Sequence, residues 1–272
     1  MQLFKLAAIS LLISLSPFAY AESANKAAWQ PRTDVAAAYI LTVNNTPLWQ
    51  ANASKRLPPA SLTKLVTALV LLDNPKLSAW VTISKNASQQ QGTRLRLKPK
   101  QQFRAAYLMG AMLMKSANDA CTALAEWDAG SEAAFVKKMN TKLITLKLKD
   151  THFSNACGFD GAQHYSTAND LLAIAKVSNA QAKIKVWTEM KDYTLESKTG
   201  QSYQLVTSNM LLGRVEGADG LKTGYTQAAG KCLIAHGIRN KKEVYLVLLN
   251  APDRWWDADE LMNRAFDDDA IQ

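Results

Sequence analysis

Residues that commonly ligate metals are scarce in this chain of 272 residues, which has three cysteines and three histidines. Cys121, Cys157 and Cys232 fit no zinc-binding spacing, and the histidines show no metal-ligand pattern. We therefore expect neither a metal centre nor a cofactor. An odd number of cysteines leaves at least one thiol unpaired. We expect Cys121 and Cys232 to be small buried residues rather than disulfide partners.

Long apolar runs are also absent, except at the N-terminus. There Lys5 precedes the apolar run Leu6–Leu15, and Ala19–Ala21 has the small-x-small pattern of a cleavage site. Residues 1–21 thus predict a cleaved secretory signal, because the run is short for a membrane span and Pro17 follows it. The expected product is a periplasmic protein without a stable membrane anchor.

Acidic residues are outnumbered, with 23 Asp and Glu against 32 Lys and Arg and a formal net charge of +9. A basic exported chain favours anionic surroundings, such as an acidic polymer. No nucleic-acid-binding motif is present, and export argues against such a partner. The basic residues between 94 and 104 are more typical of a solvated face than of a polymer-docking patch.

The chain has the length of one large domain or two small ones. Residues 22–35 are small and polar, which is typical of a flexible lead-in. We assign residues 36–268 to a single catalytic domain. No C-terminal β domain is expected after it.

Strand patterns lie at both ends of this domain and helical patterns lie between them. A hairpin is predicted over 36–49, and residues 75–185 are mainly helical, with short extended pieces near 80–84 and 94–97. Antiparallel strands are expected in the last third, before a helix over 257–267. This order predicts an α/β unit of the α+β type, whose sheet combines the N- and C-terminal parts.

Three short motifs follow one another along the chain. They are S-x-x-K at Ser61–Lys64, S-x-N at Ser116–Asn118 and K-T-G at Lys222–Gly224. Each motif alone is common, and second copies occur at Ser23–Lys26 and Lys198–Gly200. Those copies lie in a polar tail and a polar turn, so we do not expect them to form a site.

The first motif begins an apolar helix that extends to Leu72. Lys64 lies three residues after Ser61 and therefore on the same helix face. Burial of a lysine disfavours its cation and lowers its pKa, so a neutral Lys64 amine can take the proton of the Ser61 hydroxyl. The helix N-terminus also favours developing negative charge. The motif thus predicts acyl transfer through a serine ester.

The second motif supplies polar groups beside this pair. We expect the Ser116 hydroxyl to relay protons, although a helix cap is the alternative. The Asn118 amide is expected to bind substrate and Lys64.

The third motif predicts the strand along which a substrate lies. Lys222 and Thr223 supply a cation and a hydroxyl for a carboxylate. Gly224 lacks a side chain, which would let an extended substrate approach the strand. The backbone N–H groups of Tyr225 and Ser61 are expected to form an oxyanion hole.

In order and context, these motifs resemble those of the low-molecular-mass penicillin-binding proteins, the serine D-alanyl-D-alanine carboxypeptidase family. The resemblance covers about residues 35–268. Matching blocks are Pro59–Lys64, Lys115–Ala120, Met139–Asn140, Thr151–Phe153, Ser166–Asp170 and Asp219–Thr226. It implies a β-lactamase/transpeptidase-like fold, with a five-stranded antiparallel sheet, flanking helices and a helical subdomain.

The resemblance also implies roles for individual residues. Ser61 corresponds to the acylated nucleophile, Lys64 to its general base and Ser116 to the proton relay, while Asn118 and Lys222 correspond to substrate-binding positions. The implied reaction removes the terminal D-alanine from peptidoglycan stem peptides. β-Lactam antibiotics would be covalent inhibitors.

Two further positions bear on the resemblance. Cys157 stands where the family often has histidine, and we expect a tolerated small residue, with a free thiol near the cleft as the alternative. Arg254 lies in a segment that resembles a family segment near the cleft, where a contact with the substrate carboxylate is one interpretation.

Three rival functions remain open. A D,D-endopeptidase that cuts peptidoglycan cross-links would use the same motifs and chemistry. A class A β-lactamase would need an E-x-x-L-N sequence between the second and third motifs, and residues 119–221 contain none. An inactive peptidoglycan-binding module would not need the intact motifs.

Overall fold

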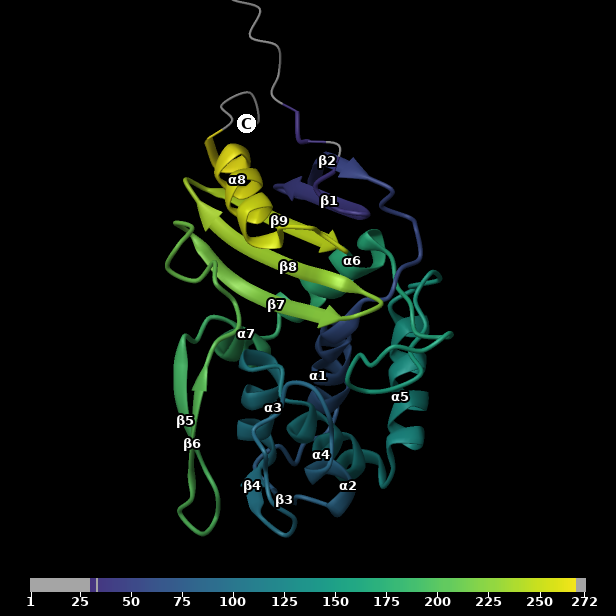
Figure 1. Ribbon diagram of the computed structural model, residues 1–272, viewed down its shortest axis with the longest axis vertical. Helices are drawn as coiled ribbons and strands as arrows, with labels where there is room; N and C mark the ends of the chain where they lie inside the picture. Colours follow the sequence, from purple (N-terminus) through teal and green to yellow (C-terminus); the bar gives the residue numbers. More distant parts are fainter. Residues whose placement is uncertain (1–29, 33, 268–272) are drawn as a thin grey trace, which may run out of the picture. The chain divides into compact units, whose positions relative to one another are not determined.

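Five antiparallel strands form the main sheet, in the order β2-β1-β9-β8-β7 (Figure 1). The computed structural model describes residues 30–32 and 34–267. The predicted signal peptide lies outside the described residues, as do residues 22–29 of the lead-in. The strands are β1 (Ala38–Val43), β2 (Thr46–Ala51), β7 (Ala218–Thr226), β8 (Gly230–Arg239) and β9 (Lys242–Leu249). Because β1 pairs with β9, the two ends of the domain share one sheet, which confirms the predicted architecture.

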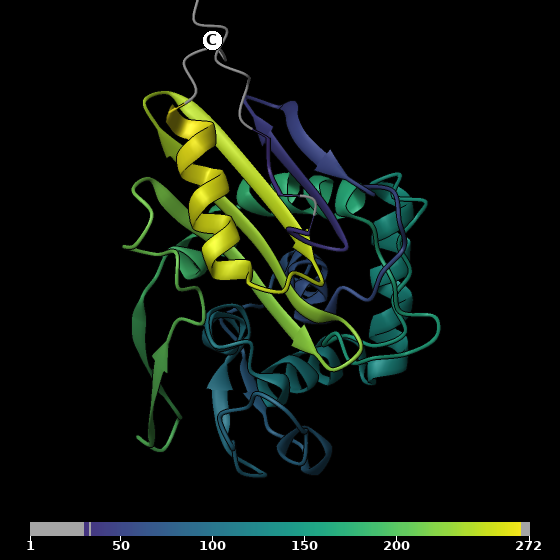
Figure 2. The same ribbon diagram turned by 45° about the horizontal axis from the view of Figure 1, so that its top comes forward.

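Helices cover both faces of the sheet. Helix α8 (Arg254–Asp267) crosses one face, and α6 (Ala168–Asn179) lies behind the other, so that both pack on β9 (Figures 1 and 2). Residues 244–249 of β9 are all buried. A near-continuous apolar run is what a strand covered on both faces requires.

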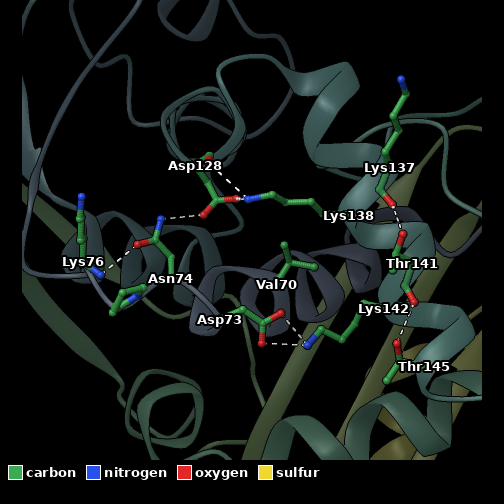
Figure 3. Close-up of a pocket in the computed structure, with 11 residues that line it drawn as sticks. Val70, Asp73, Asn74, Lys76, Asp128, Lys137, Lys138, Thr141, Lys142 and Thr145 are labelled. Carbon is green, nitrogen blue, oxygen red and sulfur yellow. Dashed lines mark hydrogen bonds and ion pairs between the residues drawn. The ribbon is translucent and has the colours of Figure 1, made fainter.

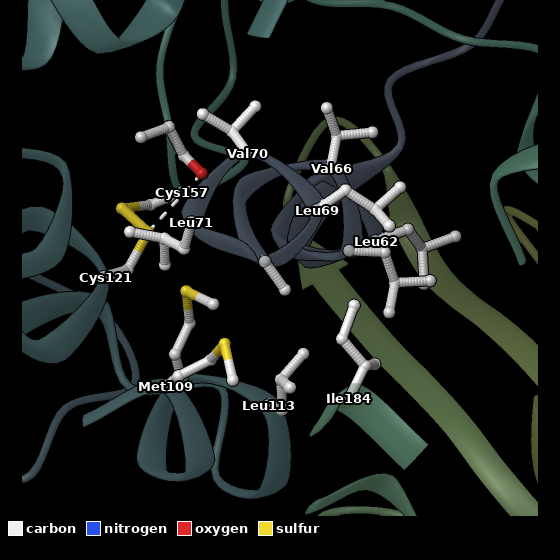
Figure 4. Packing of buried hydrophobic residues seen from close by; sticks show 14 of the residues in the cluster. Leu62, Val66, Leu69, Val70, Leu71, Met109, Leu113, Cys121, Cys157 and Ile184 are labelled. Atoms are coloured by element: carbon white, nitrogen blue, oxygen red, sulfur yellow. Dashed lines mark hydrogen bonds between the residues drawn. A yellow bond between two sulfur atoms is a disulfide. The ribbon is translucent and has the colours of Figure 1, made fainter. Parts of the chain in front are cut away.

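The helical region is built around α1 (Lys64–Leu72), of which all residues except Leu72 are buried. Leu62, Val66, Leu113 of α3 and Ile184 of α7 belong to the core that surrounds this helix, with Val66 on the opposite side of the helix from Leu113 and Ile184 (Figure 4). Burial on every side explains why the sequence of α1 is apolar nearly all round. The other elements are η1 (Ala60–Thr63), α2 (Lys85–Ser88), α3 (Ala105–Met114), α4 (Asn118–Ala129), α5 (Glu132–Thr145) and α7 (Ala182–Thr188).

Two small two-stranded sheets complete the fold. Strand β3 (Trp80–Thr82) pairs with β4 (Gln102–Arg104), and β5 (Asp192–Glu196) pairs with β6 (Ser202–Val206). The extended piece predicted over 94–97 is wrong as a strand. The backbone N–H groups of Leu95 and Leu97 instead donate to the Asp119 carboxylate at 3.0 Å each. A side chain thus takes the place of a partner strand for this loop.

The expectation that Cys121 is unpaired is wrong, because Cys121 and Cys157 form a disulfide (Figure 4). Their Cα atoms are 5.9 Å apart, although 36 positions separate them in the sequence. Cys157 is therefore neither a free thiol nor a merely tolerated small residue. Cys232 is a buried free cysteine, as expected, and burial raises the pKa of its thiol to about 11.

Candidate active site

The first motif forms the turn η1 and the first residue of α1. Thr63 Oγ1 donates to the Ala60 carbonyl at 2.8 Å, which closes the turn around Ser61. The Ser61 hydroxyl is partly exposed and lies 2.8 Å from Lys64 Nζ. A nucleophile that solvent can reach thus touches a nitrogen base.

Lys64 is fully buried, and its amine has three partners. Besides Ser61 Oγ, the Nζ atom contacts Asn118 Oδ1 at 2.8 Å and the Cys157 carbonyl oxygen at 2.5 Å. Burial, and then the charge of Lys222, hold the pKa of Lys64 well below its ordinary value. A neutral amine has two N–H groups and one lone pair. Asn118 Oδ1 and the Cys157 carbonyl oxygen can only accept hydrogen bonds, so they take the two N–H groups of the neutral amine. The lone pair of Lys64 Nζ then faces the Ser61 hydroxyl.

The orientation of the Asn118 amide supports this assignment. Its Nδ2 group donates to the Gln91 carbonyl at 2.7 Å, so its Oδ1 atom is the one that faces Lys64. The Asn118 backbone N–H donates to the Thr93 carbonyl at 2.8 Å. The loop 91–97 therefore holds Asn118 through both its side chain and its backbone.

Ser116 links the second motif to the third. Lys222 Nζ donates to Ser116 Oγ at 2.9 Å and to the Thr223 carbonyl at 2.8 Å. The alternative of a Ser116 helix cap is wrong, because Ala117 is the N-cap of α4 and no side chain caps that end. Burial, and then the charge of Arg254, lower the pKa of Lys222 to about 7.

Strand β7 forms the far wall of the site. Thr223 Oγ1 lies 2.8 Å from Ser208 Oγ, and the Tyr225 side chain is 65% exposed. At Gly224 a Cβ atom would lie 3.1 Å from the Ser61 backbone nitrogen and from the Pro59 carbonyl oxygen. The missing side chain therefore lets β7 approach the nucleophile turn. This approach sets Ser61 N beside the strand, where an oxyanion hole requires it.

Two residues outside the motifs also hold the turn. Gly158 has a φ of +86°, and a Cβ there would lie 2.0 Å from the Ala60 carbonyl oxygen. His164 Nε2 lies 2.8 Å from Thr63 Oγ1, and burial lowers the pKa of His164 to about 4. Sequence reasoning missed both residues, although a glycine next to Cys157 was a usable signal.

Arg254, at the start of α8, contacts the third motif through the backbone. Its Nη1 group donates to the Gly224 carbonyl at 2.6 Å and to the Cys232 carbonyl at 3.1 Å. Burial lowers the pKa of Arg254. In this structure the guanidinium thus supports β7 from the side of α8.

A hollow of about 690 Å³ lies elsewhere, between the end of α1, α4 and α5 (Figure 3). Its floor includes Val70. Two of its lysines are paired with aspartates, Lys138 with Asp128 at 2.7 Å and Lys142 with Asp73 at 2.7 Å. No residue of the three motifs lines it. We therefore place the candidate site at Ser61 and not in this hollow.

Over residues 30–32 and 34–267, no helix combines the length and apolarity needed to cross a bilayer. Within the same ranges, no three His, Cys, Asp or Glu side chains converge as a metal ion would require.

Comparisons with known proteins agree with this geometry. A family model described as D-alanyl-D-alanine carboxypeptidase matches residues 24–253. A D-alanyl-D-alanine carboxypeptidase of Bacillus subtilis, DacF, is 32% identical over 247 residues, which cover 89% of this chain and 64% of that protein. Another from Escherichia coli, DacA, is 34% identical over 220 residues, which cover 75% of this chain and 53% of that protein. The chain thus spans about half to two thirds of these relatives.

Solved structures show the same fold. The Streptomyces K15 DD-transpeptidase superposes with a TM-score of 0.81 at 29% identity, covering 88% of this chain and 99% of that one. A D-alanyl-D-alanine carboxypeptidase from Mycobacterium tuberculosis gives a TM-score of 0.79 at 29% identity, covering 88% and 96%. The predicted DD-transpeptidase/β-lactamase-like fold is confirmed. Together with the matched family model, this shows that the chain belongs to the D-alanyl-D-alanine carboxypeptidase family, Peptidase S11.

Proposed function

We propose that this chain is a serine-type D-alanyl-D-alanine carboxypeptidase that acts on peptidoglycan stem peptides. The observation that carries the proposal is the contact of 2.8 Å between Lys64 Nζ and Ser61 Oγ inside a buried site. Family membership supplies the substrate class, a peptide that ends in D-Ala-D-Ala. The roles of the individual residues follow from the contacts around that pair.

Acylation begins when Ser61 Oγ attacks the carbonyl carbon of the penultimate D-alanine and its proton passes to Lys64 Nζ. The oxyanion that forms accepts hydrogen bonds from the backbone N–H groups of Ser61 and Tyr225. The approach of β7 to the nucleophile turn at Gly224 supports this pairing. The lone pair of Lys64 is available because two carbonyl-type oxygens take its protons.

Collapse of the tetrahedral intermediate breaks the carbon–nitrogen bond. The leaving D-alanine amine needs a proton, and we assign its delivery to the Ser116 hydroxyl, which Lys222 Nζ holds at 2.9 Å. The proton that Lys64 took from Ser61 then restores the Ser116 hydroxyl, so Lys64 becomes neutral again and Lys222 keeps its charge. The cation of Lys222 also favours binding of the terminal carboxylate, together with the Thr223 hydroxyl. Water then hydrolyses the ester on Ser61 and restores the free serine. β-Lactams would acylate the same hydroxyl.

The family is one of cell-wall enzymes, which places its substrate outside the cytoplasm. We propose a periplasmic location, supported by the signal-peptide pattern over residues 1–21.

The test combines labelling and product analysis. Purified protein is incubated with a fluorescent penicillin, and the adduct is mapped by peptide mass spectrometry. We expect the label on Ser61, no label in Ser61→Ala, and nearly none in Lys64→Ala. Released D-alanine is then measured with an uncross-linked pentapeptide. Folded wild-type protein that takes no label would instead indicate an inactive binding module, and fast penicillin turnover would indicate a β-lactamase.

Endopeptidase activity is the nearest rival, since it breaks a D-alanine-linked amide by the same steps. Cross-linked muropeptide dimers in a parallel digestion decide between the two. Conversion of dimers to monomers without free D-alanine would replace the carboxypeptidase assignment. Because one superposed structure is a DD-transpeptidase, an amine acceptor such as glycine is added in a third arm. Transfer of the acyl group to that amine in preference to water would assign transpeptidation.

A further inference from the structure

The disulfide joins the same two backbone segments that contact the catalytic amine of Lys64. The Cys157 carbonyl oxygen lies 2.5 Å from Lys64 Nζ. Cys121 lies on α4, almost one turn after Asn118, whose Oδ1 atom lies 2.8 Å from the same nitrogen. The Cys121–Cys157 disulfide therefore joins the two backbone segments that carry the acceptors of the Lys64 protons (Figure 4).

We propose that this disulfide is a positioning element that fixes the orientation of the Lys64 amine, so that oxidised protein acylates Ser61 faster than reduced protein. The inference rests on the proposed function of Ser61 and Lys64, and it adds a dependence on redox state. The family pattern often has histidine at position 157 and gives no reason to expect such a link.

Packing explains why the bond matters. Two thiols need more room than one bonded pair of sulfur atoms, and a close-packed interior offers little. Both cysteines are fully buried, at 0% and 1% exposure. Reduction therefore forces the two sulfurs apart inside a closed core. The extra separation must come from new rotamers or from a shift of residue 157 relative to α4.

Other contacts keep the segment folded without the bond. Asn155 Oδ1 accepts from the backbone N–H groups of Gly158 at 2.8 Å and Phe159 at 2.9 Å. Glu132 Oε1 accepts from the Ala156 N–H at 3.0 Å. These bonds lie on either side of residue 157 and do not fix its carbonyl against Asn118. We therefore expect reduction to misplace the Lys64 amine without unfolding the domain.

The test compares acylation in oxidised and reduced protein. A phosphine reductant takes an oxygen atom from water and becomes a phosphine oxide, while the sulfur–sulfur bond breaks and the two protons of water end on the thiols. Thiol counting under denaturing conditions verifies reduction. The second-order rate constant for labelling by a fluorescent penicillin is then measured from pH 5 to pH 9.

We expect reduction to lower this rate constant at pH 7 by about tenfold or more, the scale of a loss from a misplaced catalytic group. The acid limb of the pH profile should also move to higher pH, because a loosened and better hydrated amine regains protons more readily. A merely structural role would leave the limb in place. Partial unfolding would lower the final extent of labelling rather than shift the limb.

The double variant Cys121→Ala/Cys157→Ala is the matched control. It removes the link without crowding two thiols into the core, so it should show slower labelling and a displaced acid limb that are no larger than in the reduced protein, and reductant should change it no further. Because it retains Cys232, an effect of reductant through that thiol would persist in it. Rate constants within twofold and identical limbs in oxidised, reduced and variant protein would overturn the inference, provided that Ser61 is labelled. Absence of labelling in oxidised wild type would instead contradict the proposed function.

Discussion

The two buried lysines predict a bell-shaped pH profile, because catalysis needs them in opposite protonation states. Lys64 must be neutral to accept the Ser61 proton, whereas Lys222 must be charged to attract a carboxylate. Burial and the Lys222 charge hold the pKa of Lys64 well below its ordinary value, and the pKa of Lys222 is about 7. Activity should fall on the acid side as Lys64 is protonated and on the alkaline side as Lys222 loses its proton.

The alkaline limb can be given a magnitude. With a pKa of about 7, half of Lys222 is charged at pH 7, and about 1% at pH 9, so kcat/KM should fall roughly 50-fold between these values. The measurement is kcat/KM for release of D-alanine, because this parameter reports the free enzyme. For a substrate with a C-terminal amide, kcat/KM should fall much less between pH 7 and pH 9, since this substrate offers no carboxylate to Lys222.

The matched variant is Lys222→Arg, which keeps a cation at every accessible pH. We expect a lower plateau and no alkaline limb between pH 7 and pH 9. A wild-type profile that stays level over that range would refute the assignment of Lys222. An alkaline limb of equal depth in Lys222→Arg would do the same.

Three further outcomes follow from the packing around the site. Since unfolded Lys222 binds a proton that the folded form lacks above pH 7, this residue should make the free energy of unfolding rise with pH between about 7 and 10.5, by up to about 1.4 kcal/mol per unit. Lys222→Met should lower the slope in urea titrations by that amount and leave the slope that neutral Lys64 contributes over the same range. Reduction of Cys121–Cys157, which closes a loop of about 36 residues, should cost about 4 kcal/mol. Calorimetry should then show Tm about 8–16 °C lower, and an unchanged Tm would contradict this. Gly224→Ala should lower the free energy of unfolding by about 1–3 kcal/mol. It should also slow penicillin labelling of the protein that remains folded. Equal labelling rates in the variant and the wild type would show that β7 does not position the nucleophile.

Much of the fold and the site follows from local sequence. The apolar run after Ser61 predicts a buried helix, and that helix, together with the 3-10 turn η1 before it, fixes the separation of Ser61 and Lys64. The strand patterns at both ends predict the shared sheet, because strands that bury one or both faces have recognisable periodicities. The context of each motif copy also separates Lys222–Gly224 from the turn at Lys198–Gly200.

What the sequence does not reveal depends on contacts between distant segments. Cys121 and Cys157 meet only because α4 packs beside the loop that carries residue 157, and no spacing rule states this. Nothing in the sequence of residues 94–97 reveals that the backbone N–H groups of Leu95 and Leu97 bond to the Asp119 carboxylate rather than to a partner strand. The packing of Gly224 against the nucleophile turn was not predicted, because that turn is far away in the chain.

The central claim is that Lys64 carries no charge at neutral pH while it touches Ser61. The most direct measurement is an NMR titration of the lysine side-chain nitrogens in isotopically labelled protein, with Lys64 assigned through Lys64→Arg. We predict a neutral-amine signal for Lys64 at pH 7 and protonation only at lower pH. An ammonium signal that persists to about pH 10, the range of an ordinary lysine, would contradict the account.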